Sequence, residues 1–408
     1  MKIAIVGAGI IGVTTAYELA SDGHEVTVFE QRSAAAEEAS FATAGLLAPH
    51  LLSPWALPGF GQPLRLMGAQ ATLRMAGGLT LANWAWLRRW RSMARSHSAP
   101  ATAVERLAQY SQTRLQSIAS QHELDFEASD GRLVLLRTEE DRTRLQPALQ
   151  VLRDSGVTLR EIDADVARQI EPGLSPEAPL AGAIHLPDAR AGNCRLFAQL
   201  LRQGIQGGGV QFVFNTRVDR LGSSPTGVVL QGEADLRRFD AVVLCAGMAS
   251  ATLLPALGLP MAAVYGYSVS APLRESTHAP RASVVDAGQQ ISITRLGQRV
   301  RIAGGAELAG ADAEHHTPTL QRLYRTLNDW FPGGVQLSSN LQIWRGARTM
   351  LPDGAPVVGA SGVPGLWINT GHGASGWALA CGSARALADL IAQREPEVSL
   401  DGLGMRRF

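Results

Sequence analysis

The pattern that most restricts the fold lies at the start of the chain, where glycines interrupt an apolar run. Residues 2–6 are largely apolar and favour a strand, residues 10–20 have helical spacing, and residues 25–30 favour a second strand. Between the first two segments, Gly7-Ala8-Gly9-Ile10-Ile11-Gly12 matches G-x-G-x-x-G. The chain therefore opens with a predicted strand, helix and strand joined by a glycine-rich turn.

The glycines of this turn have separate physical roles in binding a dinucleotide. Gly7 permits the tight turn, Gly9 lets the backbone approach a pyrophosphate, and Gly12 lets the helix pack closely on the strand. The first helical N–H groups, from Ile10 and Ile11 onward, and the helix dipole stabilise the phosphates. The motif alone does not distinguish NAD from FAD.

An acidic residue ends the second predicted strand. Glu30 lies 18 residues past Gly12 (30 − 12 = 18), close to the spacing of about 20 that is typical of this motif. We expect its carboxylate to accept hydrogen bonds from adenosine ribose hydroxyls, and we place Gln31 and Arg32 at the same end of the ligand. The sequence therefore predicts a Rossmann-like dinucleotide-binding domain.

The composition excludes several other classes of protein. A formal net charge of +1 gives no support for a nucleic-acid partner. The three cysteines are widely spaced without a C-x-x-C pair, so neither a disulfide framework nor a metal site is predicted. No apolar run approaches the roughly 18 residues of a transmembrane helix. We expect a protein of a reducing compartment, in the cytoplasm or attached to the inner face of the cell membrane.

A second set of motifs lies near the C-terminus. Residues 345–359 read R-G-A-R-T-M-L-P-D-G-A-P-V-V-G, and residues 369–383 read N-T-G-H-G-A-S-G-W-A-L-A-C-G-S. Both resemble the D-amino-acid oxidase superfamily of flavoproteins, most of all the catalytic (small) subunit of bacterial D-amino-acid dehydrogenases. Further likeness at residues 53–59, 131–140 and 266–269 extends the resemblance over nearly the whole chain. It implies an FAD-dependent dehydrogenase that oxidises the α-carbon of a small amino acid, with a D-amino acid as substrate.

The C-terminal glycine loop also suits a flavin on physical grounds. It joins a predicted strand, residues 365–369, to a helix that begins near Ala374. Glycines there let backbone N–H groups approach a flat ring, and a helix N-terminus at the flavin N1–C2=O edge would stabilise the anionic reduced flavin. We assign this loop to the cofactor through Gly371, His372, Gly373, Ala374 and Ser375.

The resemblance implies further FAD contacts by position. Val218 corresponds to the residue whose backbone meets the adenine, while Ala246 and Gly247 form the turn beside the flavin. Thr43 stands where the family usually has Asn, so a contact near the pyrophosphate or flavin is expected to differ. Cys245 and Cys381 look like packing residues, so noncovalent FAD is expected. The loop after the acidic strand contributes Ser40, Ala44, Gly45 and Leu46.

The substrate carboxylate calls for a bidentate arginine. The resemblance implies Arg348, ahead of P-D-G, for this role, and Tyr267 as a hydroxyl that helps bind the carboxylate. Tyr265 lies two residues earlier and would face the same side of a strand; one of the two tyrosines could instead belong to the core edge. His50 could face the substrate, although hydride transfer from a neutral amine needs no protein base.

These inferences combine into an α/β (α+β) fold with two domains. We expect a Rossmann-like FAD-binding domain of residues 1–52, 190–258 and 345–408. An antiparallel-sheet substrate domain would comprise residues 53–189 and 259–344.

The electron acceptor and the exact activity stay open at this point. The only lysine is Lys2, which favours a dehydrogenase over an oxidase, and the family implies a quinone or electron-transfer-chain acceptor. Residues 83–95 could lie on a membrane surface, although a core-facing helix with arginines toward solvent is favoured. The alternatives are a secondary-amine or glycine dehydrogenase or oxidase, acting on D-proline, hydroxy-D-proline or sarcosine; a subunit active only in a hetero-oligomeric complex; and a flavin-binding protein without turnover.

Overall fold

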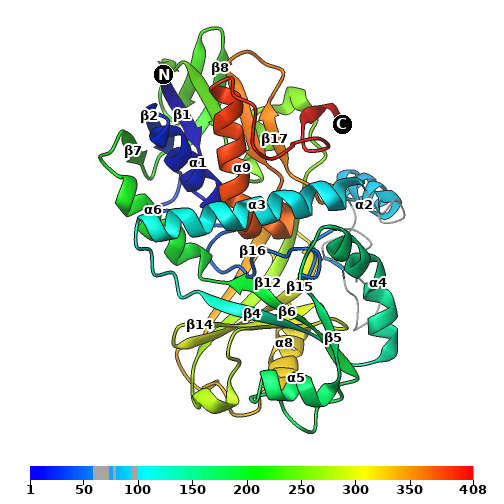
Figure 1. Ribbon diagram of the computed structural model, residues 1–408. Helices are drawn as coiled ribbons and strands as arrows, with labels where there is room; N and C mark the ends of the chain where they lie inside the picture. Colours follow the sequence, from blue (N-terminus) through cyan, green and yellow to red (C-terminus); the bar gives the residue numbers. More distant parts are fainter. Residues whose placement is uncertain (58–72, 77–79, 94–98, 408) are drawn as a thin grey trace.

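The computed structural model describes residues 1–57, 73–76, 80–93 and 99–407, and two sheets organise them (Figure 1). The first has six strands in the order β17-β18-β11-β1-β2-β7. All its neighbours are parallel except β17 and β18. The strands are β1 (Lys2–Val6), β2 (Glu25–Phe29), β7 (Val210–Val213), β11 (Ala241–Leu244), β17 (Val357–Ala360) and β18 (Leu366–Thr370).

The second sheet is larger and mainly antiparallel, with the strand order β16-β12-β15-β14-β13-β4-β6-β5 and β3 paired to β15. Only β13–β4 and β15–β3 are parallel pairs. A separate small sheet contains β8 (Val218–Ser223), β9 (Thr226–Leu230) and β10 (Arg237–Arg238). The strands of the large sheet are β3 (Arg74–Met75), β4 (Ser129–Leu136), β5 (Arg160–Ile162), β6 (Gly182–Ala191), β12 (Ala262–Pro272), β13 (Ser283–Asp286), β14 (Ile291–Leu296), β15 (Arg299–Leu308) and β16 (Gln342–Met350).

The helices cover the sheets and join their two regions. In Figure 1, α3 crosses between the two sheets beside α1 and α9, although it lies within the predicted substrate domain. Likewise, β16 continues to Met350, past the predicted domain boundary after residue 344. The helices are α1 (Ile10–Ser21), α2 (Leu81–Met93), α3 (Ala99–Gln121), α4 (Glu139–Asp154), α5 (Ala164–Ile170), α6 (Cys194–Ile205), α7 (Ala249–Leu253), α8 (Thr317–Trp330) and α9 (Gly376–Ile391), with 3-10 turns η1 (Pro255–Leu257), η2 (Ser276–His278), η3 (Gly373–Ser375) and η4 (Met405–Arg407).

An ion-pair network ties α1, α3 and α9 together. The fully buried carboxylate of Glu18 accepts from Arg114 Nε at 2.6 Å and from Arg385 Nη1 at 2.9 Å. Arg385 also pairs with Asp22 and Asp389. A buried carboxylate is stable only with such partners, because desolvation of an unpaired charge is costly. The network therefore fixes how α9, which follows the C-terminal glycine loop, sits on α1.

This network predicts acid sensitivity. Burial alone would raise the pKa of Asp22, but hydrogen bonds from Arg385 and Arg394 hold it below its ordinary value. A carboxyl with a lowered folded-state pKa stabilises the fold above its unfolded pKa of about 3.9, and this contribution is lost as pH falls through the folded pKa. We expect Asp22→Asn to lower the unfolding free energy by about 1–2 kcal/mol at pH 7. Melting temperatures of the two proteins, measured from pH 7 to pH 3, should converge toward the acid end; a constant difference would contradict this origin.

Candidate FAD and substrate site

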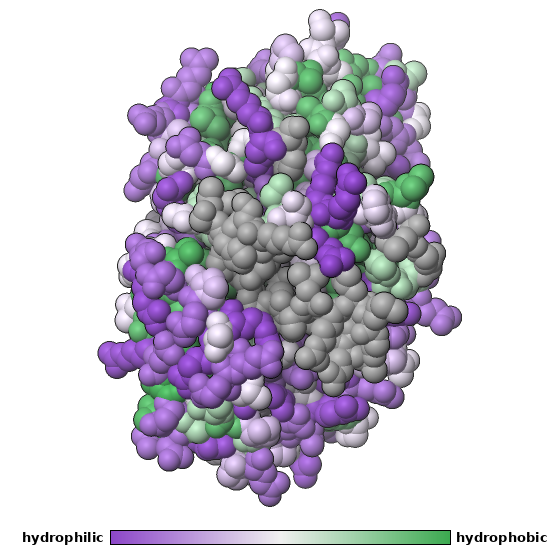
Figure 2. Space-filling view, turned by 90° about the vertical axis from the view of Figure 1, so that its right-hand side faces the viewer, coloured by the Kyte–Doolittle hydropathy of each residue, from purple (hydrophilic) through white to green (hydrophobic). Residues whose placement is uncertain are grey.

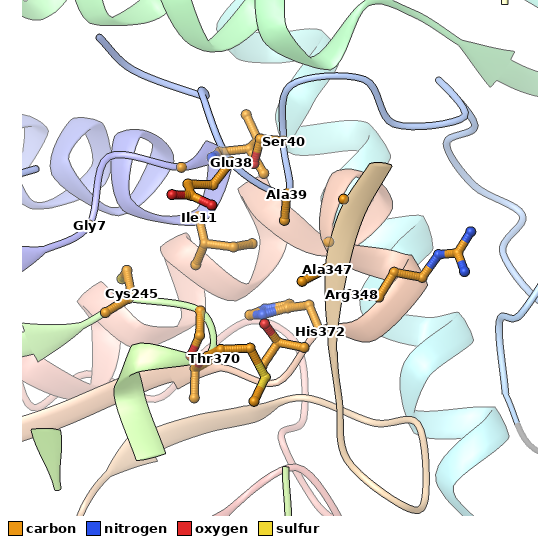
Figure 3. Close-up of a pocket in the computed structure, with 18 of the residues that line it drawn as sticks. Gly7, Ile11, Glu38, Ala39, Ser40, Cys245, Ala347, Arg348, Thr370 and His372 are labelled. Atoms are coloured by element: carbon orange, nitrogen blue, oxygen red, sulfur yellow. Dashed lines mark hydrogen bonds between the residues drawn. The ribbon is translucent and has the colours of Figure 1, made fainter. Parts of the chain in front are cut away.

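One large cavity lies between the first sheet and the large sheet, with a volume of about 480 Å³. On the side of the first sheet, its walls are the glycine-rich turn before α1, the loop after β2, the turn after β11 and the C-terminal glycine loop. On the side of the large sheet, residues of β12, β14, β15 and β16 line it. Figure 3 shows Gly7, Ile11 and Ser40 at one end, with Arg348 extending from β16 at another. The cavity is therefore long and reaches from the first helix start to the large sheet.

The glycine-rich turn has the close contacts that its sequence requires. Gly7 has a φ of +102°, a conformation that favours glycine. A Cβ on Gly12 would lie 1.8 Å from the Gly7 carbonyl oxygen, so only glycine lets α1 begin this close to the turn. Ser40 Oγ accepts from Ile10 N at 3.0 Å and holds the loop after β2 against the helix start.

Glu30 stabilises the turn itself. Its carboxylate is 8% exposed and accepts hydrogen bonds from Ala8 N at 2.7 Å and Arg32 N at 2.8 Å. Each carboxylate oxygen retains a further lone pair, so acceptance from ribose hydroxyls stays possible. Arg32 itself pairs with the exposed Glu38.

The C-terminal loop presents backbone groups and a neutral imidazole to the cavity. Gly371 and Gly373 have φ of +78° and +54°. His372 Nε2 lies 3.2 Å from Ser383 Oγ, and burial lowers the pKa of His372 to about 3. His372 is therefore uncharged at neutral pH and adds no positive charge to the cavity.

His50 supports this loop from behind. Its Nε2 lies 2.6 Å from Ser375 Oγ, and its backbone N–H donates to the buried Glu105 carboxylate at 3.0 Å. Burial lowers the pKa of His50 to about 4, so this ring is also neutral. His50 does not line the cavity among the described residues, which corrects the expectation that it faces the substrate.

Arg348 places a partly buried positive charge on the wall formed by the large sheet. Its Nη1 donates to the Gly305 carbonyl at 2.7 Å, and burial lowers the pKa of its guanidinium to about 10. The arginine therefore stays protonated at neutral pH. Within the described residues no carboxylate pairs with Arg348, although buried charges normally have partners. An anionic ligand would complete this site.

Two glycines, Gly266 and Gly305, leave space on the sheet for the Arg348 side chain. A Cβ on Gly266, which lies in β12 beside β16, would be 2.2 Å from Arg348 Nη2. Gly305 is the extra residue of a register shift in β15, where Tyr265 pairs with Glu307 but Tyr267 pairs with Gly304. With a φ of +74°, Gly305 frees the carbonyl that Arg348 binds.

Gly266→Ala should therefore disable anion binding without removing any polar group. The added methyl group would occupy the position of the Arg348 guanidinium and force it to move. We expect KM for an amino-acid substrate to rise at least about tenfold, equivalent to about 1.4 kcal/mol. Steady-state kinetics and the flavin absorbance of the purified protein would check this. An unchanged KM would mean that the observed Arg348 position is not the one that binds substrate.

Comparison with known proteins decides the family. The model of the family described as FAD dependent oxidoreductase matches residues 2–390. This chain belongs to that family. A D-amino acid dehydrogenase of Cereibacter sphaeroides is 40% identical over 422 aligned positions, covering 100% of this chain and 95% of the relative.

Solved structures share the fold of this FAD-dependent oxidoreductase at low identity. Glycine oxidase from Geobacillus kaustophilus has a TM-score of 0.76 at 21% identity, with 100% of this chain and 98% of that chain covered. L-Proline dehydrogenase from P. horikoshii has a TM-score of 0.75 at 16% identity, with 100% and 97% covered. These neighbours support the two-domain flavoenzyme fold expected from the sequence.

The residues around the cavity suit the FAD of this family. It needs a glycine turn open to a pyrophosphate, an acid at the ribose end and a glycine loop at the ring, and all three face one cavity. Most of the cofactor-binding residues expected from the sequence line it: Gly7, Gly9, Ile10, Ile11, Glu30, Gln31, Ser40, Ala44, Val218, Ala246, Gly247, Gly371, His372, Gly373 and Ala374.

Five of the expected cofactor-binding residues do not line the cavity and instead contact neighbouring parts of the chain. Arg32 faces Glu38, and Ser375 bonds to His50. Gly12 packs on Gly7, Gly45 packs on Gly192, and Leu46 forms an isolated bridge to Ala191. A direct FAD contact from these five stays a prediction, and the contacts seen here give them a supporting role.

The two tyrosines share one strand face, as expected, and it is the face opposite the Arg348 side chain. The Tyr267 hydroxyl donates to the buried Glu307 carboxylate at 2.6 Å and accepts from His316 N. The Tyr265 ring lies 3.7 Å from the Arg345 guanidinium and does not line the cavity. Tyr267 borders the cavity, but its hydroxyl is engaged on the other side of the sheet. The expectation that the Tyr267 hydroxyl binds a carboxylate is therefore wrong for this conformation, and Tyr265 is the tyrosine that does not line the cavity.

Sequence reasoning missed the residues that form the cavity floor. Strand alternation puts Gly266, Ser268 and Trp344 on the same side as Arg348, and Ser292 and Ala303 join them from β14 and β15. A run of small side chains on one face of two paired strands would have indicated this floor. The sequence does not show which residues of β12 lie beside which residues of β16, so that shared face could not be predicted.

Proposed function

We propose that this FAD-dependent oxidoreductase catalyses the oxidative deamination of a D-amino acid. The observation that carries the proposal is the partly buried guanidinium of Arg348, which lines the cavity without a described acidic partner. An amino-acid carboxylate would supply that partner through bidentate hydrogen bonds. The D-amino acid dehydrogenase name of a 40% identical relative supports the substrate class.

The chain's own residues bind and orient the substrate. Arg348 holds the carboxylate, Gly266 makes room for the Arg348 guanidinium, and the small floor residue Ala303 leaves room for the α-carbon. Bound FAD supplies a two-electron acceptor for the hydride from that carbon. His50 and His372 are neutral and hydrogen-bonded, so neither is needed as a base if the amine enters uncharged. The imino acid formed reacts with water to give a 2-oxo acid and ammonia.

We also propose that FAD is bound noncovalently. Cys245 borders the cavity, but its Sγ lies 3.8 Å from Thr15 Oγ1, and burial raises the pKa of this thiol to about 12. A protonated thiol is a poor nucleophile toward the flavin. Acid precipitation of the purified protein should release all yellow colour into the supernatant. Colour retained in the pellet would contradict noncovalent binding.

The proposed acceptor is a quinone or another component of an electron-transfer chain, reached by peripheral membrane contact of α2. Trp86, Leu87 and Trp90 are buried, whereas Leu81 and Trp84 are 89% and 51% exposed. Arginines at 88, 89 and 91 would favour anionic lipid headgroups. No helix among the described residues is long and apolar enough to cross a bilayer.

The side of the molecule with α2 and α4 supports only a shallow contact. Among the side chains coloured in Figure 2, hydrophilic ones predominate on this side, with hydrophobic ones scattered among them. Binding to vesicles with anionic lipid should fall when Leu81 and Trp84 are both changed to Ser. If this variant bound the vesicles as well as the wild-type protein does, the membrane proposal would be contradicted, and the proposed chemistry would be unaffected.

Product analysis tests the proposed reaction. Purified holoenzyme with D-alanine and a soluble quinone should form pyruvate and ammonia in equal amounts, with one quinone reduced per pyruvate. L-Alanine should give neither product. Faster turnover of sarcosine, glycine or D-proline than of any primary D-amino acid would instead favour a secondary-amine or glycine dehydrogenase.

A further inference from the structure

A second buried arginine lies on the same sheet face as the cavity floor. Arg301 belongs to β15, two residues before Ala303, which lines the cavity. It pairs with Ser270 on β12 and Thr294 on β14. The side chain is 7% exposed, and burial lowers its pKa to about 10, so it stays charged at neutral pH.

The positive charge of Arg301 has little compensation within the described residues. No ion pair joins it to a described carboxylate, and its Nε has no hydrogen-bond partner. Glu127, whose charge acts to raise the pKa of Arg301, already accepts a hydrogen bond from Asn193 Nδ2 at 2.7 Å. Arg195 and Arg299 add further positive charge nearby. Burying a charge without a partner costs desolvation free energy, which attraction to a negatively charged ligand, or to negative charge that forms on a ligand during reaction, would offset.

Arg301 also holds the loop that borders the cavity after β2. Its Nη1 donates to the Thr43 carbonyl at 3.2 Å, and Thr294 Oγ1 donates to the next carbonyl, that of Ala44, at 2.9 Å. Gly192 N donates to the Gly45 carbonyl at 2.8 Å. Three successive carbonyls of this loop are therefore bound from outside the cavity.

This anchoring determines where the loop N–H groups point. In a trans peptide the N–H points opposite to the C=O of the same unit. The Thr43 carbonyl faces Arg301, so the Ala44 N–H is turned to the other side, and Ala44 lines the cavity. Among the described hydrogen bonds the Ala44 N–H has no acceptor. The next N–H, that of Gly45, donates to Thr43 Oγ1 at 3.4 Å.

We infer that Arg301 is a positioning residue for the flavin: it orients the Thr43–Gly45 loop with the Ala44 N–H toward the ring, and its charge stabilises the reduced, anionic flavin. Two-electron reduction places negative charge on the ring, and fixed donors and charges in a dry site favour that state. The two histidines near the cavity are neutral, so any full positive side-chain charge that acts beside the helix N-termini comes from arginines. The inference requires FAD in this cavity but does not depend on the identity of the substrate.

The midpoint potential of the bound flavin tests this role directly. In Arg301→Gln, which removes the charge, we expect the equilibrium constant for two-electron reduction to fall about tenfold, a shift of about −30 mV. Sulfite affinity should fall by a similar factor, because sulfite adds to the oxidised flavin and leaves a negative charge on it. Arg301→Lys keeps the charge and should stay within about threefold of the wild type.

Arg299→Gln is the matched control. Arg299 lies two residues farther from the cavity on β15 and bonds to Ser270 and Asn340, so its loss should leave the potential unchanged. An equal shift in Arg299→Gln, or no shift in Arg301→Gln, would overturn the inference.

Thr294→Val tests the loop half of the inference with a nearly isosteric change, and it stays informative if Arg301 variants fail to fold. It removes the bond to the Ala44 carbonyl without changing charge. We expect about a threefold fall in the same reduction constant, and an unchanged constant would contradict the loop orientation. Flavin bleaching of the wild type by D-amino acids is a separate result, so failure of the deaminase proposal would be recognised independently.

Discussion

Arg348→Met should lower kcat/KM for D-alanine about 10³-fold while FAD stays bound. The guanidinium is the cavity cation without a described acidic partner, and it is the group proposed to hold the substrate carboxylate. Truncating one partner of a buried, hydrogen-bonded charge pair costs about 2–5 kcal/mol. A cost of about 4 kcal/mol corresponds to 10³-fold. Stopped-flow flavin reduction and the absorbance spectrum of the variant would measure both parts of this expectation.

Two controls sharpen this prediction. Arg348→Lys keeps a charge but lacks the planar fork, so it should recover only part of the lost rate. Arg220→Met removes an exposed arginine from β8 and should leave kcat/KM unchanged. If Arg348→Met turned over D-alanine at the wild-type rate, the carboxylate would have to bind elsewhere in the cavity.

Gly12→Ala should abolish FAD retention. The new methyl carbon would lie 1.8 Å from the Gly7 carbonyl oxygen, and a backbone atom cannot move aside as a flexible side chain can. Either α1 or the turn before it must shift, and each carries the N–H groups proposed for the pyrophosphate. We expect a loss of about 3 kcal/mol in unfolding free energy, at the upper end of overpacking costs, and a colourless protein after purification. FAD content per chain and thermal unfolding would measure this.

Gly204→Ala is the contrasting substitution. Gly204 lies inside α6, and its nearest non-local atom would be 3.9 Å from the new Cβ. Alanine is favoured over glycine in a helix interior by about 1 kcal/mol and by less in the last turn, where Gly204 lies, so this variant should be slightly more stable and fully yellow. A destabilised Gly204→Ala, or a yellow Gly12→Ala, would show that close approach at the turn is not what restricts residue 12.

Local sequence patterns were sufficient for the nucleotide-binding half of the fold. The opening β1-α1-β2 unit, β18 and α9 all lie close to their expected ranges, because apolar periodicity and glycine turns are short-range signals. The large sheet was less predictable. Its β6 strand contains Pro187, and a proline argues against a strand when the hydrogen-bonding pattern is unknown.

The substrate side of the cavity shows most clearly what the sequence cannot specify. Tyr265 and Tyr267 alternate correctly on β12, but pairing with β16 puts them on the face opposite Arg348. A register shift of one residue would exchange the two faces, and only the assembled sheet determines which one meets the cavity. Arg301 likewise gains its role from its hydrogen bond to Thr43, which lies 258 residues away in the sequence.

The most direct measurement mixes the purified yellow protein anaerobically with single amino acids and follows the oxidised flavin band. A set of D-amino acids and their L-enantiomers, with glycine, sarcosine and D-proline included, covers the proposed substrate class and its rivals. The account predicts complete bleaching by at least one primary D-amino acid and none by its L-enantiomer, with the 2-oxo acid recovered after quench. Bleaching by L-enantiomers, or by no amino acid although FAD is bound, would contradict it.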